Sequence, residues 1–208
     1  MIVKILLLSL TSVLITILTT PYIKKIALKY NILDHPNNRK VHKKPIPQLG
    51  GLSIYLAFLI NTLLFNENHT LQITLIIGAT LILIIGLIDD IKEIRAIVKF
   101  IAQLFVAYLT WEMGIKISII SNPFGGILNT SILSLPITML WIVSLINAIN
   151  LIDGIDGLAT GITAIASLIL SIIALTTGQW MAACLSATLF GSCLGFLKYN
   201  FFPAKMFL

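Results

Sequence analysis

Two adjacent aspartates, Asp89 and Asp90, directly follow a long apolar run over residues 71–88. Neighbouring carboxylates repel each other unless a proton or a cation compensates their charge. Mg²⁺ suits this task, because it takes one or two protein carboxylates and keeps its other positions for water and substrate phosphates. The pair therefore predicts a magnesium site. The alternative is that the two aspartates only end a helix at a membrane surface.

A second group of polar residues recurs at every third position where another apolar run, residues 133–151, ends. Its members are Asn147, Asn150, Asp153 and Asp156. On a helix such residues stay on one broad face, and the glycine after each aspartate lets the backbone loosen there. Polar residues in apolar segments by default mark function, although a hydrogen-bonding stripe between helices is the alternative. Together, the two acidic groups favour a shared metal and phosphate site.

The segment 34–51 is basic and interrupted by prolines. Its Arg39 and Lys40 are of the types that bind phosphates, although a basic loop can also be a topology signal that contacts anionic lipid. The glycines Gly50 and Gly51 begin the next apolar run. They would either offer backbone N–H groups to an anion or allow close helix packing.

The composition shows which elements must position these residues. The chain has 208 residues, of which 58% are hydrophobic and only 11% charged, and its net charge is +6. A soluble domain carries about 25% charged residues, so the sequence excludes a soluble enzyme, a disulfide scaffold, a disordered chain and a nucleic-acid-binding protein. It predicts a polytopic membrane protein.

Seven apolar runs predict an all-α bundle of about seven transmembrane helices that forms a single domain over residues 1–208. Twelve of the 14 Lys and Arg residues flank alternate ends of these runs. The positive-inside rule therefore places the N-terminus outside, and both acidic groups on the cytoplasmic side of the cell membrane. The runs cover residues 5–27, 51–65, 71–88, 97–111, 133–151, 158–176 and 180–197.

Two smaller features complete the expected architecture. The stretch 116–135 contains Asn-Pro and Gly-Gly, which favour a loop with a short β-hairpin around residues 123–126. Cys184 and Cys193 are nine positions apart in one apolar run, so on a helix they point to opposite faces. We therefore expect two packing residues and no internal disulfide.

Four segments resemble, in order, the motifs of the polyprenyl-phosphate N-acetylhexosamine-1-phosphate transferases of glycosyltransferase family 4. The first is DHPNNRKVHKKPIPQLGG (34–51), and the third, NAINLIDGIDGLATG (147–161), carries a highly specific pattern. The others are GLIDDIKEIRAIVKFIAQ (86–103) and GFLKYNFFPAKMF (195–207). The first segment is more similar to the branch that transfers GlcNAc-1-phosphate than to the muramoyl-pentapeptide branch.

The resemblance implies transfer of N-acetylhexosamine-1-phosphate from a UDP-sugar to undecaprenyl phosphate, with release of UMP. It implies Mg²⁺ as the cofactor, with Mn²⁺ as an alternative, and Asp89 and Asp90 as the catalytic and metal-binding residues. The family tends to form homodimers, which the residues themselves do not indicate. The substrate-binding residues implied by the matching segments are Asn150, Asp153, Asp156, Arg39, Lys40, His42 and Lys99.

Members of this family continue beyond the PAKxF stretch with a further metal-binding aspartate, more membrane spans and a His-rich loop. The sequence therefore resembles the N-terminal two-thirds of such an enzyme, and we expect weak or no substrate binding by this part alone. A catalytically incomplete fragment or a non-catalytic membrane subunit is thus an alternative. An ion-coupled transporter is a further one, although transporters place their sites near the midplane and often contain inverted repeats.

Overall fold

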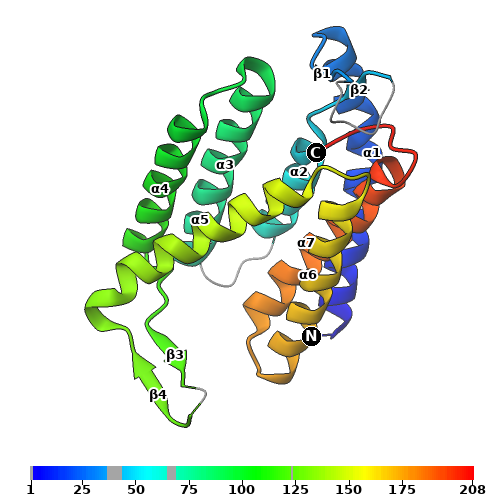
Figure 1. Cartoon of the computed structure of the whole chain (residues 1–208). Coiled ribbons are helices and arrows are strands. Elements are labelled where there is room, and N and C mark those ends of the chain that lie inside the picture. The colour runs from blue at the N-terminus through cyan, green and yellow to red at the C-terminus, as the bar shows by residue number, and fades with distance from the viewer. Residues whose placement is uncertain (1, 37–43, 65–68, 123) are drawn as a thin grey trace. The chain divides into compact units, whose positions relative to one another are not determined.

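The computed structural model describes residues 2–36, 44–64, 69–122 and 124–208. Within these residues the chain forms seven α-helices and two short antiparallel β-ribbons (Figure 1). The residues group into two compact units, of which the first joins Met1–Glu67 with Asn150–Leu208 and the second is Asn68–Ile149. The expectation of one membrane domain over the whole chain stays a prediction.

The first unit consists of four helices and the ribbon of β1 and β2. Helix α7 packs against both α1 and α6, and α6 and α7 form a helical hairpin. Helix α2 contacts α1 and α7 (Figure 1). The ribbon pairs Leu33 with Pro47, which closes the loop between α1 and α2. The elements are α1 (Ile2–Lys29), β1 (Leu33–Asp34), β2 (Ile46–Pro47), α2 (Gly50–Leu64), α6 (Leu158–Thr176) and α7 (Trp180–Asn200).

The second unit contains a helical hairpin of α3 and α4, followed by the ribbon of β3 and β4 and by α5. Gly78 allows α3 and α4 to approach, because a Cβ at this position would lie 2.7 Å from the methyl group of Thr110. The elements are α3 (His69–Lys92), α4 (Ala96–Glu112), β3 (Ile119–Ser121), β4 (Ile127–Asn129), a 3₁₀ turn (Ser131–Leu133) and α5 (Ser134–Ile152).

Small residues bring α1 and α7 together. A Cβ at Gly191 would meet the backbone of Ser9, and one at Gly195 would lie 2.8 Å from the carbonyl oxygen of Val13. The facing stripe of α1 is small and polar, and its buried members are Ser12, Thr16 and Thr20. Small residues at positions i and i+4 are typical of helix pairs in membranes, where close packing replaces the hydrophobic effect.

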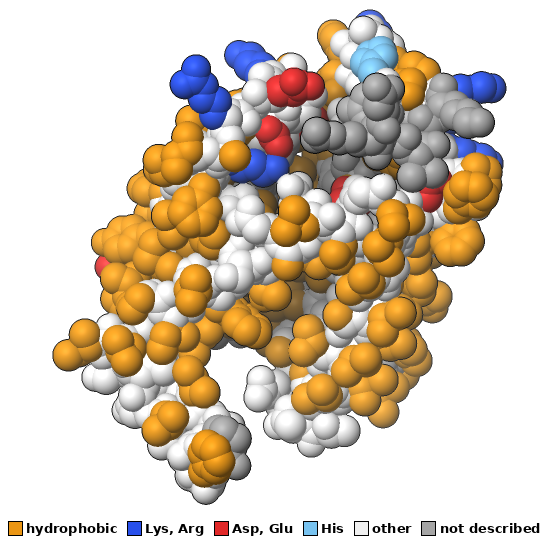
Figure 2. Space-filling view, viewed as in Figure 1, with side chains coloured by type: hydrophobic (Ala, Val, Ile, Leu, Met, Phe, Trp, Pro, Cys, Tyr) orange, Lys and Arg blue, Asp and Glu red, His pale blue; other side chains and the backbone are white. Residues whose placement is uncertain are grey.

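The large apolar side chains point away from the helix contacts. On α1 they form an exposed row that includes Leu6, Leu10, Leu14 and Leu18, with exposed fractions of 57–65%. Apolar side chains likewise cover the visible face of each unit (Figure 2). A soluble protein rarely exposes such continuous apolar surface, so the arrangement of small polar residues inside and large apolar residues outside is that of a membrane protein.

Five helices are long and apolar enough to cross a membrane, which confirms an all-α membrane protein. Helix α2, with 15 residues, is a shorter apolar helix, and α4 has 17 residues. All seven apolar runs fold as helices, whereas seven crossings and an outside N-terminus stay predictions. The five long helices are Ile2–Lys29, Thr70–Lys92, Ser131–Ile152, Leu158–Thr176 and Trp180–Asn200.

Two local predictions are confirmed. A β-hairpin forms in the predicted loop, with Ile120 of β3 opposite Leu128 of β4. The two cysteines, Cys184 and Cys193, are free and buried in α7, so they act as packing residues rather than as a disulfide.

Candidate functional site

The α3–α4 turn holds the first predicted carboxylate. Asp89 lies in the last turn of α3, and its Oδ2 accepts a hydrogen bond of 2.6 Å from Lys99 Nζ in the first turn of α4. Its Oδ1 accepts a bond of 3.2 Å from the backbone N–H of Ile94 in the connecting turn. Asp89 and Lys99, both among the predicted site residues, thus form one ion pair.

This ion pair is partly shielded from solvent. The Lys99 side chain is 19% exposed and that of Asp89 is 27% exposed, so the attraction is stronger than between two fully solvated charges. Asp90 follows in the same turn of α3 and is half-buried. Charged side chains gather around this turn, in contrast to the apolar length of α3 and α4 (Figure 2).

A buried polar pair connects α4 with α5. Asn147 Nδ2 donates to Gln103 Oε1 at 2.6 Å and to the carbonyl oxygen of Val143 at 2.8 Å, and Gln103 is buried. Both members of the pair come from the predicted motif segments. The sequence left open whether Asn147 has a functional role or forms hydrogen bonds between helices. For this residue the structure supports the hydrogen bond between helices.

The prediction that four polar residues share one helix face is wrong for two of them. Helix α5 ends at Ile152, so Asn147 and Asn150 are helical, whereas Asp153 and Asp156 lie in the turn before α6. Gly157 ends this turn as the N-cap of α6 with a φ of +72°, which an L-residue rarely takes. Asn150 and Asp153 are exposed, and Asp156 is half-buried.

Asp156 holds the segment that follows α7. Its Oδ2 accepts a hydrogen bond of 2.8 Å from the backbone N–H of Ala204. The same segment is fastened by Asn200, whose Nδ2 donates to the carbonyl oxygen of Met206 at 3.0 Å while its Oδ1 accepts from Thr160. We call residues 201–207 the tail segment. It is attached to the α5–α6 turn through a predicted site residue.

The tail segment also forms backbone hydrogen bonds with the start of α2. Phe207 donates its N–H to Pro47 and accepts the N–H of Gly50 at 2.8 Å. The N–H of Gly50 is therefore occupied, and a Cβ there would overlap the ring of Phe196 and the carbonyl oxygen of Phe207. The packing alternative for Gly50 is confirmed, and an anion site at its N–H is excluded because Phe207 takes this donor.

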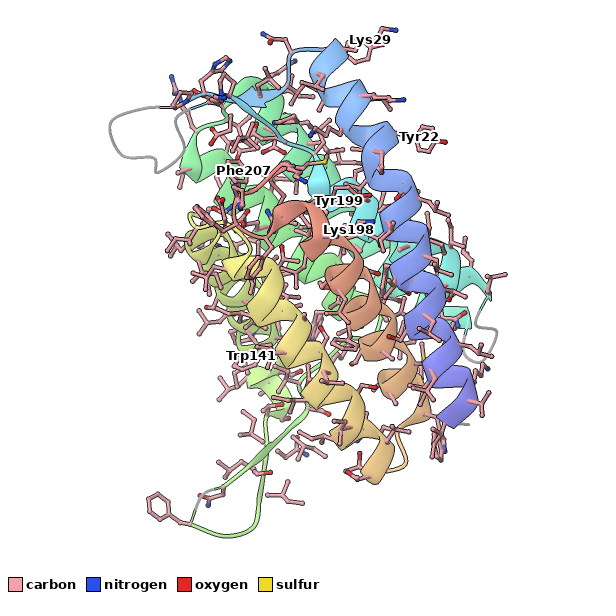
Figure 3. The ribbon with its side chains drawn as sticks, turned by 90° about the vertical axis from the view of Figure 1, so that its right-hand side faces the viewer. Tyr22, Lys29, Trp141, Lys198, Tyr199 and Phe207 are labelled. Carbon is pink, nitrogen blue, oxygen red and sulfur yellow. The ribbon has the colours of Figure 1, made fainter. Side chains whose placement is uncertain are left out.

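The orientation of α7 against α1 is fixed close to the tail segment. Tyr199, near the end of α7, donates its hydroxyl to the carbonyl oxygen of Ile17 on α1 at 3.0 Å. Figure 3 shows Tyr199 and Phe207 at the same end of this unit. In unit 1, the end of the loop before α2, the α5–α6 turn and the tail segment thus meet at one end of the helices.

Three predicted substrate-binding residues, Arg39, Lys40 and His42, lie outside the described residues. Their roles stay predictions. The sequence reasoning gave no role to Asn200, although a buried Asn close to the end of an apolar run was a signal for it. The attachment of Ala204 to Asp156 had no sequence signal, because a backbone N–H is common to nearly all residues.

The carboxylates of the α3–α4 turn limit which metal ion these residues can hold. Among the described residues, no group of three or more His, Cys, Asp and Glu side chains comes together. A metal that needs three or four protein ligands, such as Zn²⁺, therefore does not fit these residues. The two carboxylates of Asp89 and Asp90 fit Mg²⁺, which takes one or two and completes its shell with water and phosphate oxygens. Such an ion would compete with Lys99 for Asp89.

The fold and the site define a membrane-embedded helical protein with charged residues at its helix ends. Comparison with known proteins then gives its family. Residues 72–208 match the model of the family described as glycosyl transferase family 4. The chain belongs to this family.

Three relatives illustrate the similarity. The probable undecaprenyl-phosphate N-acetylglucosaminyl 1-phosphate transferase of Bacillus subtilis is 39% identical over 95% of this chain. The decaprenyl-phosphate N-acetylglucosaminephosphotransferase of Mycolicibacterium smegmatis is 33% identical over 97% of the chain. The phospho-N-acetylmuramoyl-pentapeptide-transferase of Clostridioides difficile is 32% identical over 90% of it. The chain covers 56%, 55% and 63% of the lengths of these relatives.

Proposed function

We propose that this chain takes part in the transfer of N-acetylhexosamine-1-phosphate, specifically GlcNAc-1-phosphate, from a UDP-sugar to undecaprenyl phosphate with release of UMP. The proposal is supported by the family and by the names of the relatives. Two relatives, at 39% and 33% identity, are named for N-acetylglucosamine phosphate. The relative named for N-acetylmuramoyl-pentapeptide is 32% identical over a smaller share of this chain.

The observation that carries the proposal is the ion pair of Asp89 and Lys99. A polyprenyl phosphate keeps its chain in the bilayer and its charged phosphate at the surface, so its reaction needs charged groups where apolar helices end. The pair lies at such an end, between α3 and α4. An ammonium group that pairs with a carboxylate can instead pair with a phosphate oxygen.

The reaction needs positioning and charge compensation more than covalent chemistry by the protein. An oxygen of the lipid phosphate would attack the sugar-bearing phosphorus, and the bond from this phosphorus to UMP would break. Asp89 and Asp90 would hold Mg²⁺, or Mn²⁺, which when bound compensates the negative charge of the diphosphate. Lys99 would bind phosphate oxygens beside them.

The UDP-sugar would bind at the α5–α6 turn. Asn150 and Asp153 are exposed to solvent, where a ligand can reach them. One carboxylate oxygen of Asp156 accepts the N–H of Ala204, so this residue would both contact the donor and hold the tail segment. The basic segment that contains Arg39, Lys40 and His42 would add further phosphate contacts.

The test uses membranes that contain the chain, supplied with UDP-GlcNAc, undecaprenyl phosphate and Mg²⁺, and measures UMP. We expect little or no release from the chain alone. When the C-terminal part of the family, which the resemblance implies, is co-expressed with the chain, we expect release that depends on the lipid phosphate and is lost in the double variant Asp89→Asn/Asp90→Asn. The matched control is Glu93→Gln, an exposed carboxylate directly after α3, which should keep the wild-type rate. Membranes without the chain give the background.

The outcomes separate the proposal from its alternatives. No UMP even when the C-terminal part is co-expressed, or equal release from the double variant, contradicts the proposal and favours a non-catalytic membrane subunit. UMP from UDP-N-acetylmuramoyl-pentapeptide but not from UDP-GlcNAc contradicts the sugar assignment alone. Ion flux in vesicles without UMP release would favour the transporter alternative.

A further inference from the structure

The β3–β4 hairpin exposes apolar side chains on both of its faces. The whole stretch from residue 117 to residue 133 contains no charged residue. Phe124, in the connecting turn, is 96% exposed. The other large exposed side chains of the stretch are Ile119, Ile120, Ile127, Leu128, Ile132 and Leu133, with exposed fractions of 38–91%.

The hairpin is held in a defined conformation by its own hydrogen bonds. In the turn, Asn122 donates its N–H to Gly126 at 3.1 Å and its side chain accepts the N–H of Phe124 at 3.0 Å. At the base, Thr130 Oγ1 donates to Ile117, and the N–H of Ile117 donates to Thr138 Oγ1 of α5. These hydrogen bonds therefore hold the backbone that carries the apolar side chains in one conformation.

The base of the hairpin has the residues of a membrane–water boundary. Lys116 Nζ lies 4.2 Å from the ring centroid of Trp111, at the end of α4, and Trp111 Nε1 donates to Ser134 Oγ at the start of α5. Trp residues gather at the level of lipid headgroups, and Lys side chains reach to that level from helix ends. This boundary is at the opposite end of α4 from the Asp89 turn (Figure 1).

The apolar side chains and the open strand edges of the hairpin together favour one depth in the membrane. Water would leave its apolar side chains without contacts, and an isolated two-stranded hairpin is only marginally stable there. The hydrocarbon core is excluded as well, because a sheet with open edges leaves backbone groups unsatisfied in lipid. The headgroup region satisfies both demands, since it offers water to the backbone and acyl chains to the side chains.

We propose that the β3–β4 hairpin lies in the headgroup region of the membrane face opposite the Asp89 turn, with Phe124 inserted toward the acyl chains. The partner is the lipid surface, which also suits the exposed apolar side chains of the neighbouring helices, such as Phe105 on α4 and Leu140 on α5. The hairpin would thereby fix the depth of α4 and α5 in the bilayer. This inference does not depend on the proposed enzymatic activity.

The test places an environment-sensitive fluorophore on Phe124→Cys in the full chain, reconstituted in vesicles of phosphatidylcholine and phosphatidylglycerol. Cys184 and Cys193 are buried, and the labelled wild-type chain corrects for any reaction with them. The control is Lys92→Cys, an exposed position at the end of α3. If the Phe124→Cys variant does not fold, Ile127→Cys replaces it, because Ile127 is 73% exposed.

We expect the label at position 124 to show blue-shifted emission, strong quenching by lipids with a nitroxide near the headgroup, and weak quenching by aqueous iodide. The label at position 92 should show the reverse. Strong iodide quenching at position 124 overturns the proposal. So does self-quenching that falls when the chain is diluted with lipid, because the hairpin would then contact a second copy of the chain.

Discussion

Asp89 and Asp156 stand at the ends of apolar segments, but they hold different kinds of partner. Asp89 accepts from the ammonium group of Lys99, and Asp156 accepts from the backbone N–H of Ala204. An ammonium on a long side chain can move to another anion, whereas a backbone N–H stays with its segment. The comparison indicates that Asp89 can exchange Lys99 for another cation during a reaction, whereas Asp156 holds the tail segment in place.

The same contrast extends to the units around these residues. In the first unit, backbone bonds from Phe207 and close contacts at Gly191 and Gly195 hold the elements. In the second unit, side-chain pairs such as Asn147 with Gln103 carry much of the described connection between helices. Backbone contacts tolerate few changes in side-chain size, so the two units should respond differently to substitution.

The largest effect is expected for Lys99→Met, which removes the exchangeable partner of Asp89. If the proposed transfer occurs, the rate of UMP release should fall about a hundredfold, as for the loss of a group that stabilises charge in a transition state. Lys99→Arg keeps the charge and should recover part of the rate. Lys92→Met, a loss of charge in the last turn of α3, serves as the control, and an equal loss there would contradict the special role of Lys99.

The next effect tests the close packing of the first unit. Gly50→Ala places a methyl group against the Phe196 ring and the Phe207 carbonyl, so thermal unfolding in detergent should show a free energy of unfolding lower by about 1–3 kcal/mol. Gly51→Ala is the matched control, because nothing lies within 4 Å of its added Cβ. That change should be neutral or stabilise by up to about 1 kcal/mol through helix propensity. Equal effects at both glycines would refute the packing argument.

A smaller effect is expected for Asp156→Ala, which leaves the N–H of Ala204 without its acceptor. The free energy of unfolding should fall by about 1 kcal/mol, and hydrogen exchange of the tail segment should become faster. Asp156→Asn keeps a carbonyl oxygen and should restore slow exchange. Asp89→Ala should leave exchange in the tail segment unchanged. Faster exchange there would mean that the two carboxylates are not separate in function.

The smallest effect is expected for the side-chain pair of the second unit. A double-mutant cycle of Asn147→Ala and Gln103→Ala should give a coupling free energy of about 0.6 kcal/mol, the average for hydrogen bonds between membrane helices. The matched cycle in the first unit uses Thr160→Ala and Asn200→Ala. It should give the larger coupling, because Asn200 also holds the tail segment. Equal coupling free energies in the two cycles would contradict the expected difference between the two units.

Much of the fold could be predicted because apolar runs are long and are separated by charges, prolines and glycines. Helix α6 begins and ends where its run predicted, at residues 158 and 176. The prediction was less accurate where the chain changes direction. Spacing alone placed Asp153 and Asp156 on a helix, but periodicity cannot locate a turn such as the one between α5 and α6, which ends at Gly157 with a positive φ.

Part of the candidate site was also readable in advance. Asp89 was predicted because acidic residues at the ends of apolar runs are costly and few, whereas Lys99 was predicted only from the resemblance to a known family. Their pairing was not predicted, because it depends on the turn that brings the first residues of α4 back to the last turn of α3. Among the predicted polar residues, Asn147 proved to join two helices.

The sequence by itself determined the class of the protein, its helices and the residue types available for phosphate chemistry, because hydropathy and charge act locally along the chain. Only the tertiary structure decided how those residues are used. The N–H of Gly50 is given to Phe207, and the carboxylate of Asp156 to Ala204. Such partners lie 48 or more positions apart and meet through backbone groups, which have no signature in the sequence.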